Sequence, residues 1–260
     1  MNNIFLVHNK FNEHKKITLK AYMVNAFLLV FLLFLFFYLS FLSASYNFDF
    51  MAIYEYKDKM IHGFFTSFFI SVLSLVVGVI FALILCYMSL CKIVLFNMFA
   101  RVFIELVRGT PLLVQILLIY YIFADNLGLD NRYVCGVLIL ALFASAYICE
   151  IFRAGILSVD KMQYESAKAL GLSEFEIYKS VIFPQALKNI LAPLSGQLSN
   201  LIKDSSLLSV IAISELTQNA QEINAFTFST LEIYIPLALC YLVLTLPISM
   251  FSRKLEKSFS

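Results

Sequence analysis

The sequence predicts an all-α membrane protein that crosses the bilayer several times. Three observations support this prediction: 61% of the residues are hydrophobic, only 14% are charged, and the mean hydropathy is +0.86. A soluble domain has about 25% charged residues. With so little polar surface to present to water, the chain must have lipid as its main solvent. Helices are then expected, because an open strand edge in lipid would leave backbone groups unpaired.

The apolar residues fall into runs that predict about six transmembrane helices. A bilayer core of roughly 30 Å requires about 20 apolar residues in a helix. Five runs meet this requirement, and one of them is interrupted by Arg108, Gly109 and Pro111. A further run is weaker because Lys203 and Asp204 lie inside it. In chain order the predicted spans are 21–42, 64–91, 99–124, 133–152, 190–213 and 231–251.

The first run is expected to be a retained helix rather than a cleaved signal peptide. Ser43-Ala44-Ser45 weakly resembles a cleavage site. However, the apolar run has about 22 residues, whereas the apolar part of a signal peptide has roughly 7–15. We therefore expect residues 1–20 to be a basic cytoplasmic tail and residues 21–45 to be an additional N-terminal transmembrane helix.

The positions of Lys and Arg predict the orientation, because cytoplasmic loops are enriched in these residues. One side of the predicted topology would hold only Lys57, Lys59 and Arg132. The other side would hold both tails and the loops that contain Lys92, Arg101, Arg153, Lys161, Lys168, Lys179 and Lys188. Both termini, including the tail 255–260, are therefore expected in the cytoplasm. This arrangement requires an even number of spans and agrees with six.

The stretch 158–185 is the sizeable cytoplasmic loop of this topology, and its residues favour two short helices. The first would run from 164 to 170 and end at Gly171, which suits the left-handed position that follows many helices. Ser173 would cap the second, with two glutamates in its first turn. Pro184 would stop or kink that second helix. One face of it would be apolar and consist of Phe175, Tyr178, Ile182 and Phe183.

This loop resembles the EAA signature of ABC importer permeases, E-A-A-x3-G-x9-I-x-L-P. The matching residues, at all the expected spacings, are Glu165, Ser166, Ala167, Gly171, Val181, Phe183 and Pro184. Ser, Val and Phe replace Ala, Ile and Leu, and each replacement keeps size or apolarity. The resemblance covers roughly residues 63–254 and implies a type I ABC importer permease fold with a transmembrane domain over that range.

Two further stretches resemble the polar amino-acid subfamily of these permeases. Residues 108–115, R-G-T-P-L-L-V-Q, are similar to its R-G-T-P-x-x-x-Q segment. Residues 203–207, K-D-S-S-L, are similar to its K-D-T-S-L segment, with Ser205 for Thr. The subfamily often has Gly where this chain has Met162, so the turn into the loop helix can differ. The resemblance implies a permease subunit that carries an amino acid delivered by a solute-binding protein.

The resemblance also implies that the helix at 165–170 docks in a cleft of a cytoplasmic ATPase subunit. Glu165 would anchor it by charge and hydrogen bonds, and Gly171 would permit the tight turn. By composition alone the loop could equally be a solvated amphipathic segment at the lipid headgroups. The residues assigned to ATPase coupling are Glu165, Ser166, Ala167, Leu170, Gly171 and Pro184.

Charged residues inside the predicted spans are candidates for the substrate pathway. A charge at the bilayer centre costs about 2.5–3.5 kcal/mol on insertion scales, so such residues usually face the protein interior or a water-filled path. An amino acid carries both charges and requires complementary ones, although a buried structural network would also explain Lys203 and Asp204. The residues assigned to the pathway or a gate are Arg108, Thr110, Gln115, Gln197, Asn200, Lys203, Asp204 and Ser205.

The interrupted third span allows two interpretations. Glu105 and Arg108 are three residues apart on one helix and can pair, either structurally or as part of a gate. Thr110 and Pro111 fit the N-cap and first position of a new helix. The span would then be broken, with a helix N-terminus facing inward, which is a favourable site for a carboxylate.

The sequence places the energy source in another chain. No phosphate-binding G-x-x-x-x-G-K-[ST] loop is present, and no glycine is followed by Lys. The expected partners are cytoplasmic ABC ATPase subunits that bind ATP and Mg, a second permease chain, an extracytoplasmic solute-binding protein and membrane lipid, with no nucleic acid. No catalytic or metal site is expected, since His8, His14 and His62 lack ligand spacing. The expected location is the bacterial inner membrane. A secondary transporter and a membrane-bound enzyme are the competing classes.

Overall fold

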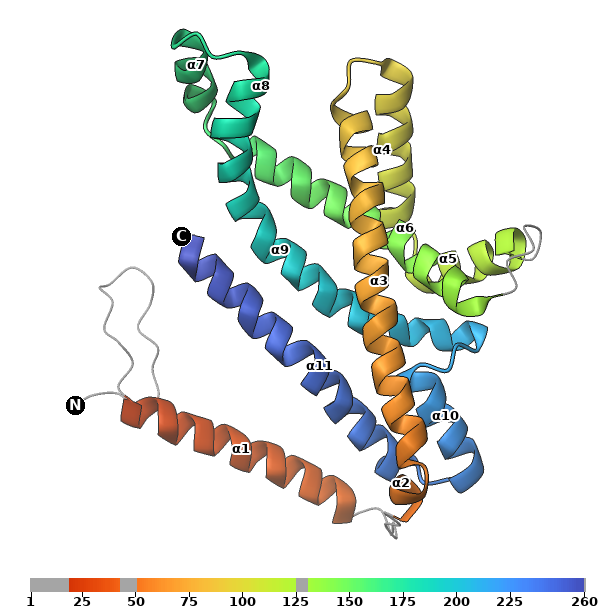
Figure 1. Ribbon diagram of the computed structural model, residues 1–260. Helices are drawn as coiled ribbons and strands as arrows, with labels where there is room; N and C mark the ends of the chain where they lie inside the picture. The colour runs from red at the N-terminus through yellow and green to blue at the C-terminus, as the bar shows by residue number, and fades with distance from the viewer. Residues whose placement is uncertain (1–18, 43–50, 125–130, 260) are drawn as a thin grey trace. The chain divides into compact units, whose positions relative to one another are not determined.

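The computed structural model describes residues 19–42, 51–124 and 131–259. The chain divides into two units, Met1–Phe48 and Asp49–Ser260. The regular elements of the described ranges are all helical, which confirms the predicted all-α class (Figure 1). In the first unit the described element is α1, Leu19–Leu42. This helix covers the predicted first span, while residues 1–18 of the predicted tail and residues 43–45 lie outside the described residues.

The second unit holds the remaining helices. In chain order these are α2 (Met51–Glu55), α3 (Lys57–Leu90), α4 (Val94–Gly109), α5 (Leu112–Leu118), the π-helix η1 (Ile119–Ala124), α6 (Arg132–Leu157), α7 (Lys161–Ala169), α8 (Glu174–Ile177), the π-helix η2 (Tyr178–Ile182), α9 (Phe183–Asp204), the 3₁₀-helix η3 (Ser205–Ile211), α10 (Leu216–Thr227) and α11 (Thr230–Phe259).

Small residues allow α3 and α6 to pack closely along the core of this unit. Ser67, Ser71, Ser74 and Gly78 are buried on one side of α3. A Cβ at Gly78 would lie 3.1 Å from the Ala141 carbonyl oxygen of α6. In lipid there is no hydrophobic force between helices, so such close backbone contact is a main source of association.

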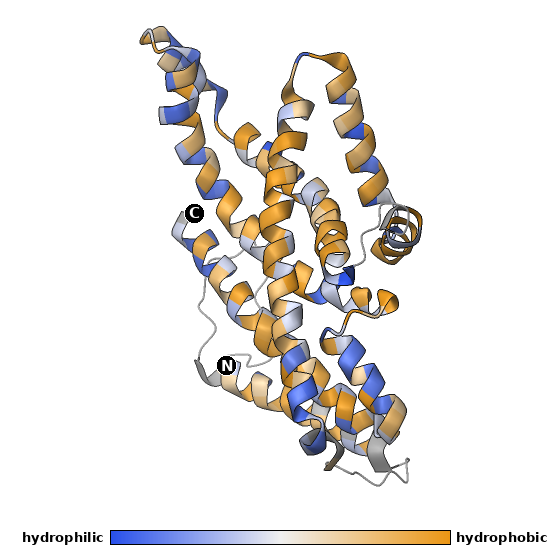
Figure 2. Ribbon diagram, turned by 45° about the vertical axis from the view of Figure 1, so that its right-hand side comes forward, coloured by the Kyte–Doolittle hydropathy of each residue, from blue (hydrophilic) through white to orange (hydrophobic). Residues whose placement is uncertain are grey.

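Apolar side chains cover the outer surfaces of the long helices, as expected for contact with lipid. Phe69, Ile80 and Leu83 of α3 are more than half exposed. Figure 2 shows hydrophobic colour along the middle of this unit and hydrophilic colour toward its two ends. The α7–α8 segment lies at one end, and α2 and α10 lie at the other (Figure 1).

In the described residues three helices are long and apolar enough to cross a bilayer, or four if the bent α4–α5 pair counts as one span. The three are α3, α6 and α11. They overlap the predicted spans 64–91, 133–152 and 231–251. The predicted number of six stays a prediction. The predicted fifth span corresponds to α9 followed by η3, which is too polar to meet this criterion.

The third predicted span is broken where the sequence suggested. The α4 helix ends at Gly109, α5 begins at Leu112, and the two are bent by 112°. The prediction that Thr110 caps the second helix was wrong by one residue, since Pro111 is the N-cap. Thr110 instead ends α4, and its hydroxyl donates to the Leu106 carbonyl oxygen at 2.8 Å.

The predicted turn of the loop 158–185 has the local structure that its residues favour. Gly171 has φ +81°, and the amides of Gly171 and Leu172 donate to the carbonyls of Lys168 and Ala167 at 3.0 and 3.3 Å. These two bonds form the Schellman motif that ends α7. Ser173 is the N-cap of α8, with a reciprocal capping box to Glu176.

Two details of the loop differ from the prediction. Pro184 does not stop the helix, because η2 leads directly into α9 and Pro184 lies in the first turn of α9. The predicted apolar face is only partly packed within this unit, since Phe175 and Phe183 are 72% and 60% exposed whereas Ile182 is buried. The buried contacts are made by Ile177 and Ile182, which pack with Ala167. The π-helical segment η2 lies between Phe175 and Phe183, so the angular spacing of these residues differs from that in a regular α-helix.

Candidate functional site

An open pocket of about 350 Å³ lies between α6 and α9, and we refer to it as the polar cavity because charged and amide side chains line it. Its volume is within the range of roughly 300–1,000 Å³ that is usual for small-molecule sites. Each helix contributes residues spaced by three or four, so that one face of each borders the cavity. The lining residues are Phe143 and Tyr147 from α6 and Gln197, Asn200, Lys203 and Asp204 from α9. Four of the predicted pathway residues are therefore brought together.

The polar cavity contains one positive and one negative side chain. Lys203 and Asp204 are adjacent in the last turn of α9, and both border the cavity although neighbouring helical residues point in different directions. No salt bridge in the described ranges involves either side chain. Both charges are therefore available to a ligand that carries an ammonium group and a carboxylate.

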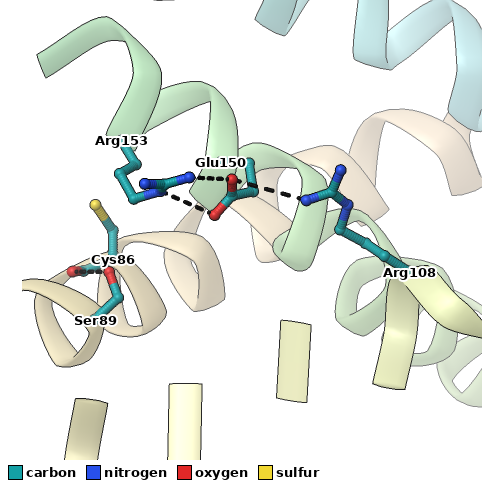
Figure 3. Close-up of polar contacts among 5 residues, drawn as sticks. All are labelled: Cys86, Ser89, Arg108, Glu150 and Arg153. Atoms are coloured by element: carbon teal, nitrogen blue, oxygen red, sulfur yellow. Dashed lines mark hydrogen bonds and ion pairs between the residues drawn. The ribbon is translucent and has the colours of Figure 1, made fainter. Parts of the chain in front are cut away.

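A charged network of Arg108, Glu150 and Arg153 lies toward the end of α6 that we predict to be cytoplasmic (Figure 3). Glu150 accepts from Arg153 through Nε at 3.1 Å and Nη2 at 2.7 Å. Glu150 Oε2 also lies 3.7 Å from Arg108 Nη1. The Arg108 guanidinium is 5.8 Å from the ring centre of Tyr147, which lines the cavity. Arg108 therefore contacts the wall of the cavity rather than its interior.

This network corrects the predicted partner of Arg108. The sequence suggested Glu105, but the ion pair present in the described residues joins Arg108 to Glu150 of α6. Glu105 is exposed on α4. The pair with Glu150 connects the end of α4 to α6, and the shared Glu150 joins two arginines at this point.

Thr110 and Gln115, predicted for the pathway, stabilise the α4–α5 bend in the structure. The side-chain amide of Gln115 donates to the Val107 carbonyl at 2.8 Å and to the Thr110 carbonyl and hydroxyl at 3.1 and 2.8 Å. Helix ends leave carbonyls without helical partners. Gln115, near the start of α5, supplies donors for those at the end of α4, which explains physically the four-residue spacing between Pro111 and Gln115.

Ser205 is also placed away from the polar cavity. It is fully buried, and its hydroxyl donates to the Ile202 carbonyl at 2.8 Å where α9 passes into η3. The Ser205 side chain is small and bonds to the backbone, and both properties suit the change from α-helix to 3₁₀-helix at this position.

Five of the six residues assigned to coupling are exposed at the surface, namely Glu165, Ser166, Leu170, Gly171 and Pro184. Glu165 lies 3.5 Å from Lys161 in an exposed ion pair, and Leu170 is 81% exposed. Ala167 is buried against the loop's own small core. The turn between α7 and α8 is stabilised by Tyr164, whose hydroxyl donates a hydrogen bond to the Glu174 carboxylate at 2.6 Å. This hydrogen bond raises the pKa of Tyr164.

Three functional candidates were missed by sequence reasoning: Phe143, Tyr147 and Glu150. The first two are aromatic residues one turn apart in a predicted span, where most aromatics simply face lipid. Glu150 is a charged residue inside a predicted span. Because a charged side chain is costly in lipid, its position could have indicated a functional or paired residue. Its two arginine partners come from different helices.

The comparisons with known proteins agree with this architecture. The family described as "Binding-protein-dependent transport system inner membrane component" matches residues 92–260. The glutamine transport system permease protein GlnP of Escherichia coli (strain K12) is 38% identical over 214 residues, covering 81% of this chain and 97% of that protein. The putative glutamine transport system permease protein GlnP of Rickettsia bellii (strain RML369-C) is 37% identical and covers 70% of this chain and 86% of its own.

Solved structures show the same fold. An amino acid ABC transporter crystallised with histidines is 36% identical, with a TM-score of 0.76, and the match covers 82% of this chain and all of that one. An inward-facing MetNI methionine ABC transporter has a TM-score of 0.66 at 14% identity, covering 77% of this chain and 96% of that one, and shows the fold alone. The chain belongs to the inner-membrane component family of binding-protein-dependent transport systems, as a permease subunit of an amino-acid ABC importer.

Proposed function

We propose that the polar cavity is the part of the translocation path that holds the backbone groups of a polar amino acid. The supporting observation is that Lys203 and Asp204 place opposite charges on one cavity, without a salt bridge in the described residues. The relatives named as glutamine permeases and the relative crystallised with histidines indicate polar amino acids as the substrate class.

Each of the four polar lining residues from α9 has a role in this proposal. Lys203 attracts the substrate carboxylate, and Asp204 attracts the ammonium group. The amides of Gln197 and Asn200 offer hydrogen bonds to a polar side chain. Arg108 was the other candidate for the carboxylate, but its contact with Glu150 makes Lys203 the better one.

In our proposal, ATP hydrolysis in a partner subunit changes the cavity by moving the predicted cytoplasmic loop. An ATPase partner that binds ATP and Mg receives α7, with Glu165 at the contact and Gly171 in the turn. Closure of two ATPase subunits then moves the loop and rocks the helices of two permease chains between inward- and outward-facing states, a rigid-body switch. A solute-binding protein delivers the amino acid at the side that carries α2 and α10.

The experiment is uptake of labelled glutamine and histidine into vesicles that contain the permease and its ATPase, with the binding protein supplied. Asp204→Asn and Lys203→Gln each remove one charge, while Asp204→Glu and Lys203→Arg keep it. Losing one partner of a buried charge interaction costs about 2–5 kcal/mol. We therefore expect the neutral variants to raise the apparent KM by roughly 30-fold or more, and the charge-keeping variants to have a smaller effect.

Lys257→Gln, an exposed change in the C-terminal part of α11, is the control for general effects of charge loss. Protein abundance in the membrane is measured for every variant. If Asp204→Asn and Lys203→Gln both transport with unchanged KM and rate, these charges are structural and the proposed role of the cavity is rejected.

A further inference from the structure

Glu215 is a fully buried carboxylate that the proposed pathway does not use. It has no exposed surface, and it is the N-cap residue of α10. Its Oε1 accepts from the Gln218 amide at 2.6 Å, and its Oε2 accepts from the Thr217 amide at 2.9 Å. These bonds satisfy amides that the helix itself leaves without partners.

The same carboxylate also binds two other helices. Its Oε2 accepts from the Tyr241 hydroxyl of α11 at 3.0 Å and from the Ser67 hydroxyl of α3 at 3.3 Å. Ser67 in turn accepts from the Leu216 amide at 3.1 Å, and Thr217 Oγ1 lies 2.8 Å from the Tyr241 hydroxyl. One buried charge thus joins α10, α3 and α11.

Only a carboxylate of this length satisfies the arrangement. Both oxygens of Glu215 accept from backbone amides, so a glutamine in either orientation would place its NH₂ group against an N–H donor. An aspartate is a good N-cap residue but is shorter by one methylene. It would keep the cap of α10 and lose reach toward Tyr241 and Ser67.

A stripe on α3 receives α10 along its length. Lys59, Gly63 and Ser67 follow at intervals of four and share one face of α3. Lys59 pairs with Glu222, and its carbonyl accepts from the Asn219 side chain at 2.8 Å. At Gly63 a Cβ would come within 2.8 Å of the Leu216 Cα, so the two backbones touch. An apolar cluster completes the contact with α11, formed by Leu216, Ala220, Ile223, Ile233 and Leu237.

We infer that Glu215 is a positioning residue that makes α10 move as one rigid unit with the first turns of α3 and the middle of α11 during transport. α10, the start of α3 and the N-terminal half of α11 lie together at the end of the second unit opposite α7 (Figure 1). Any sliding of α10 would leave a buried carboxyl group without its donors, which is unfavourable. When α3 and α11 rock during transport, α10 therefore moves with them and keeps its position relative to both helices.

Uptake per ATP hydrolysed tests this inference in the complete complex of permease, ATPase and binding protein. Glu215→Asp and the double variant Ser67→Ala/Tyr241→Phe keep a carboxylate at the N-cap of α10 but remove its bonds to α3 and α11. We expect both to lower uptake per ATP by about fivefold or more, the low end of typical coupling between sites. Thr245→Ala on α11, whose hydroxyl bonds only to the Tyr241 carbonyl, is the matched control and should be unchanged.

A second measurement does not depend on transport. Cysteines replace Lys59 and Glu222, and a short reversible bis-thiosulfonate reagent links them, with mass spectrometry as the readout. We expect the same yield without nucleotide and with ATP plus vanadate, and a lower yield when Glu215→Asp is added. The linked protein should still transport, because the link joins parts that move together.

Four outcomes would overturn the inference. The first is normal uptake per ATP in both Glu215→Asp and the double variant Ser67→Ala/Tyr241→Phe. The second is a cross-linking yield that changes with nucleotide while Glu215 is present, and the third is a cross-linking yield that Glu215→Asp leaves unaltered. The fourth is loss of transport on cross-linking that a reductant restores. A substrate outside the polar amino acids would reject the proposed role of the cavity without affecting any of these readouts.

Discussion

The Tyr147 ring lines the polar cavity, and its centre lies 5.8 Å from the Arg108 guanidinium, which is not among the lining residues. The ring shapes the wall and holds the charge outside it. Tyr147→Phe keeps the ring, whereas Tyr147→Ala removes it and lets Arg108 or water enter. An aromatic ring in contact with a cation contributes about 0.5–2 kcal/mol.

We therefore expect Tyr147→Ala to raise the apparent KM for glutamine uptake roughly 2- to 30-fold, since 1.4 kcal/mol is a factor of ten. Tyr147→Phe should stay close to the parent protein. Vesicle uptake at several glutamine concentrations provides the measurement. Equal KM values for the alanine and phenylalanine variants would show that the ring does not form the binding wall.

Predictions for single residues were confirmed where the interactions that decide the conformation lie within a few residues along the chain. Gly171 and Ser173 could be assigned from their neighbours alone, because helix ends are decided by hydrogen bonds within a few residues. The partner of Arg108 could not, because Glu150 belongs to another helix and only the packing of α4 against α6 brings the two together.

Among the helices, the α7–α8 turn offers a test of coupling. Gly171 has φ +81°, and nothing lies within 4 Å of a Cβ built there. A substitution therefore costs conformational energy without a clash, about 1–2 kcal/mol for an ordinary residue. Asn tolerates this conformation better than β-branched Val.

We expect Gly171→Val to weaken association of the permease with its ATPase by roughly 5- to 30-fold and Gly171→Asn to weaken it less. The measurement is a binding titration of purified ATPase against permease in detergent. The same affinity for both variants would argue against a docking role for this turn.

The position of the α4–α5 break could be predicted from the sequence, but its bend angle and its hydrogen bonds could not. Gly109 and Pro111 predicted the interruption, since neither favours a helix interior. The 112° bend and the role of Gln115 as a donor to the end of α4 depend on how α5 packs, which no local pattern records. The π-helical segments η1 and η2 were likewise not foreseen, because they replace regular turns without a change in composition.

For the whole molecule, the distribution of Lys and Arg predicts the orientation in the membrane. Single cysteines at Lys168 and Ser258 should react with an impermeant thiol reagent only from the cytoplasmic side, and one at Asp58 only from outside. All three positions are exposed, and the native cysteines are replaced by serine in the parent. Labelling of Asp58 and Lys168 from the same side would contradict the predicted topology.

The sequence by itself determined the helical membrane class, the family, and the positions of α3, α6 and α11, because lipid requires long apolar helices whatever their packing. It also determined the α7–α8 turn, whose hydrogen bonds are local. The tertiary structure decided which polar residues meet. It placed Phe143 and Tyr147 opposite Lys203 and Asp204, and it buried Glu215 among three helices. Such contacts join residues far apart in the chain, so they depend on helix rotation and depth, which hydrophobic patterns leave open.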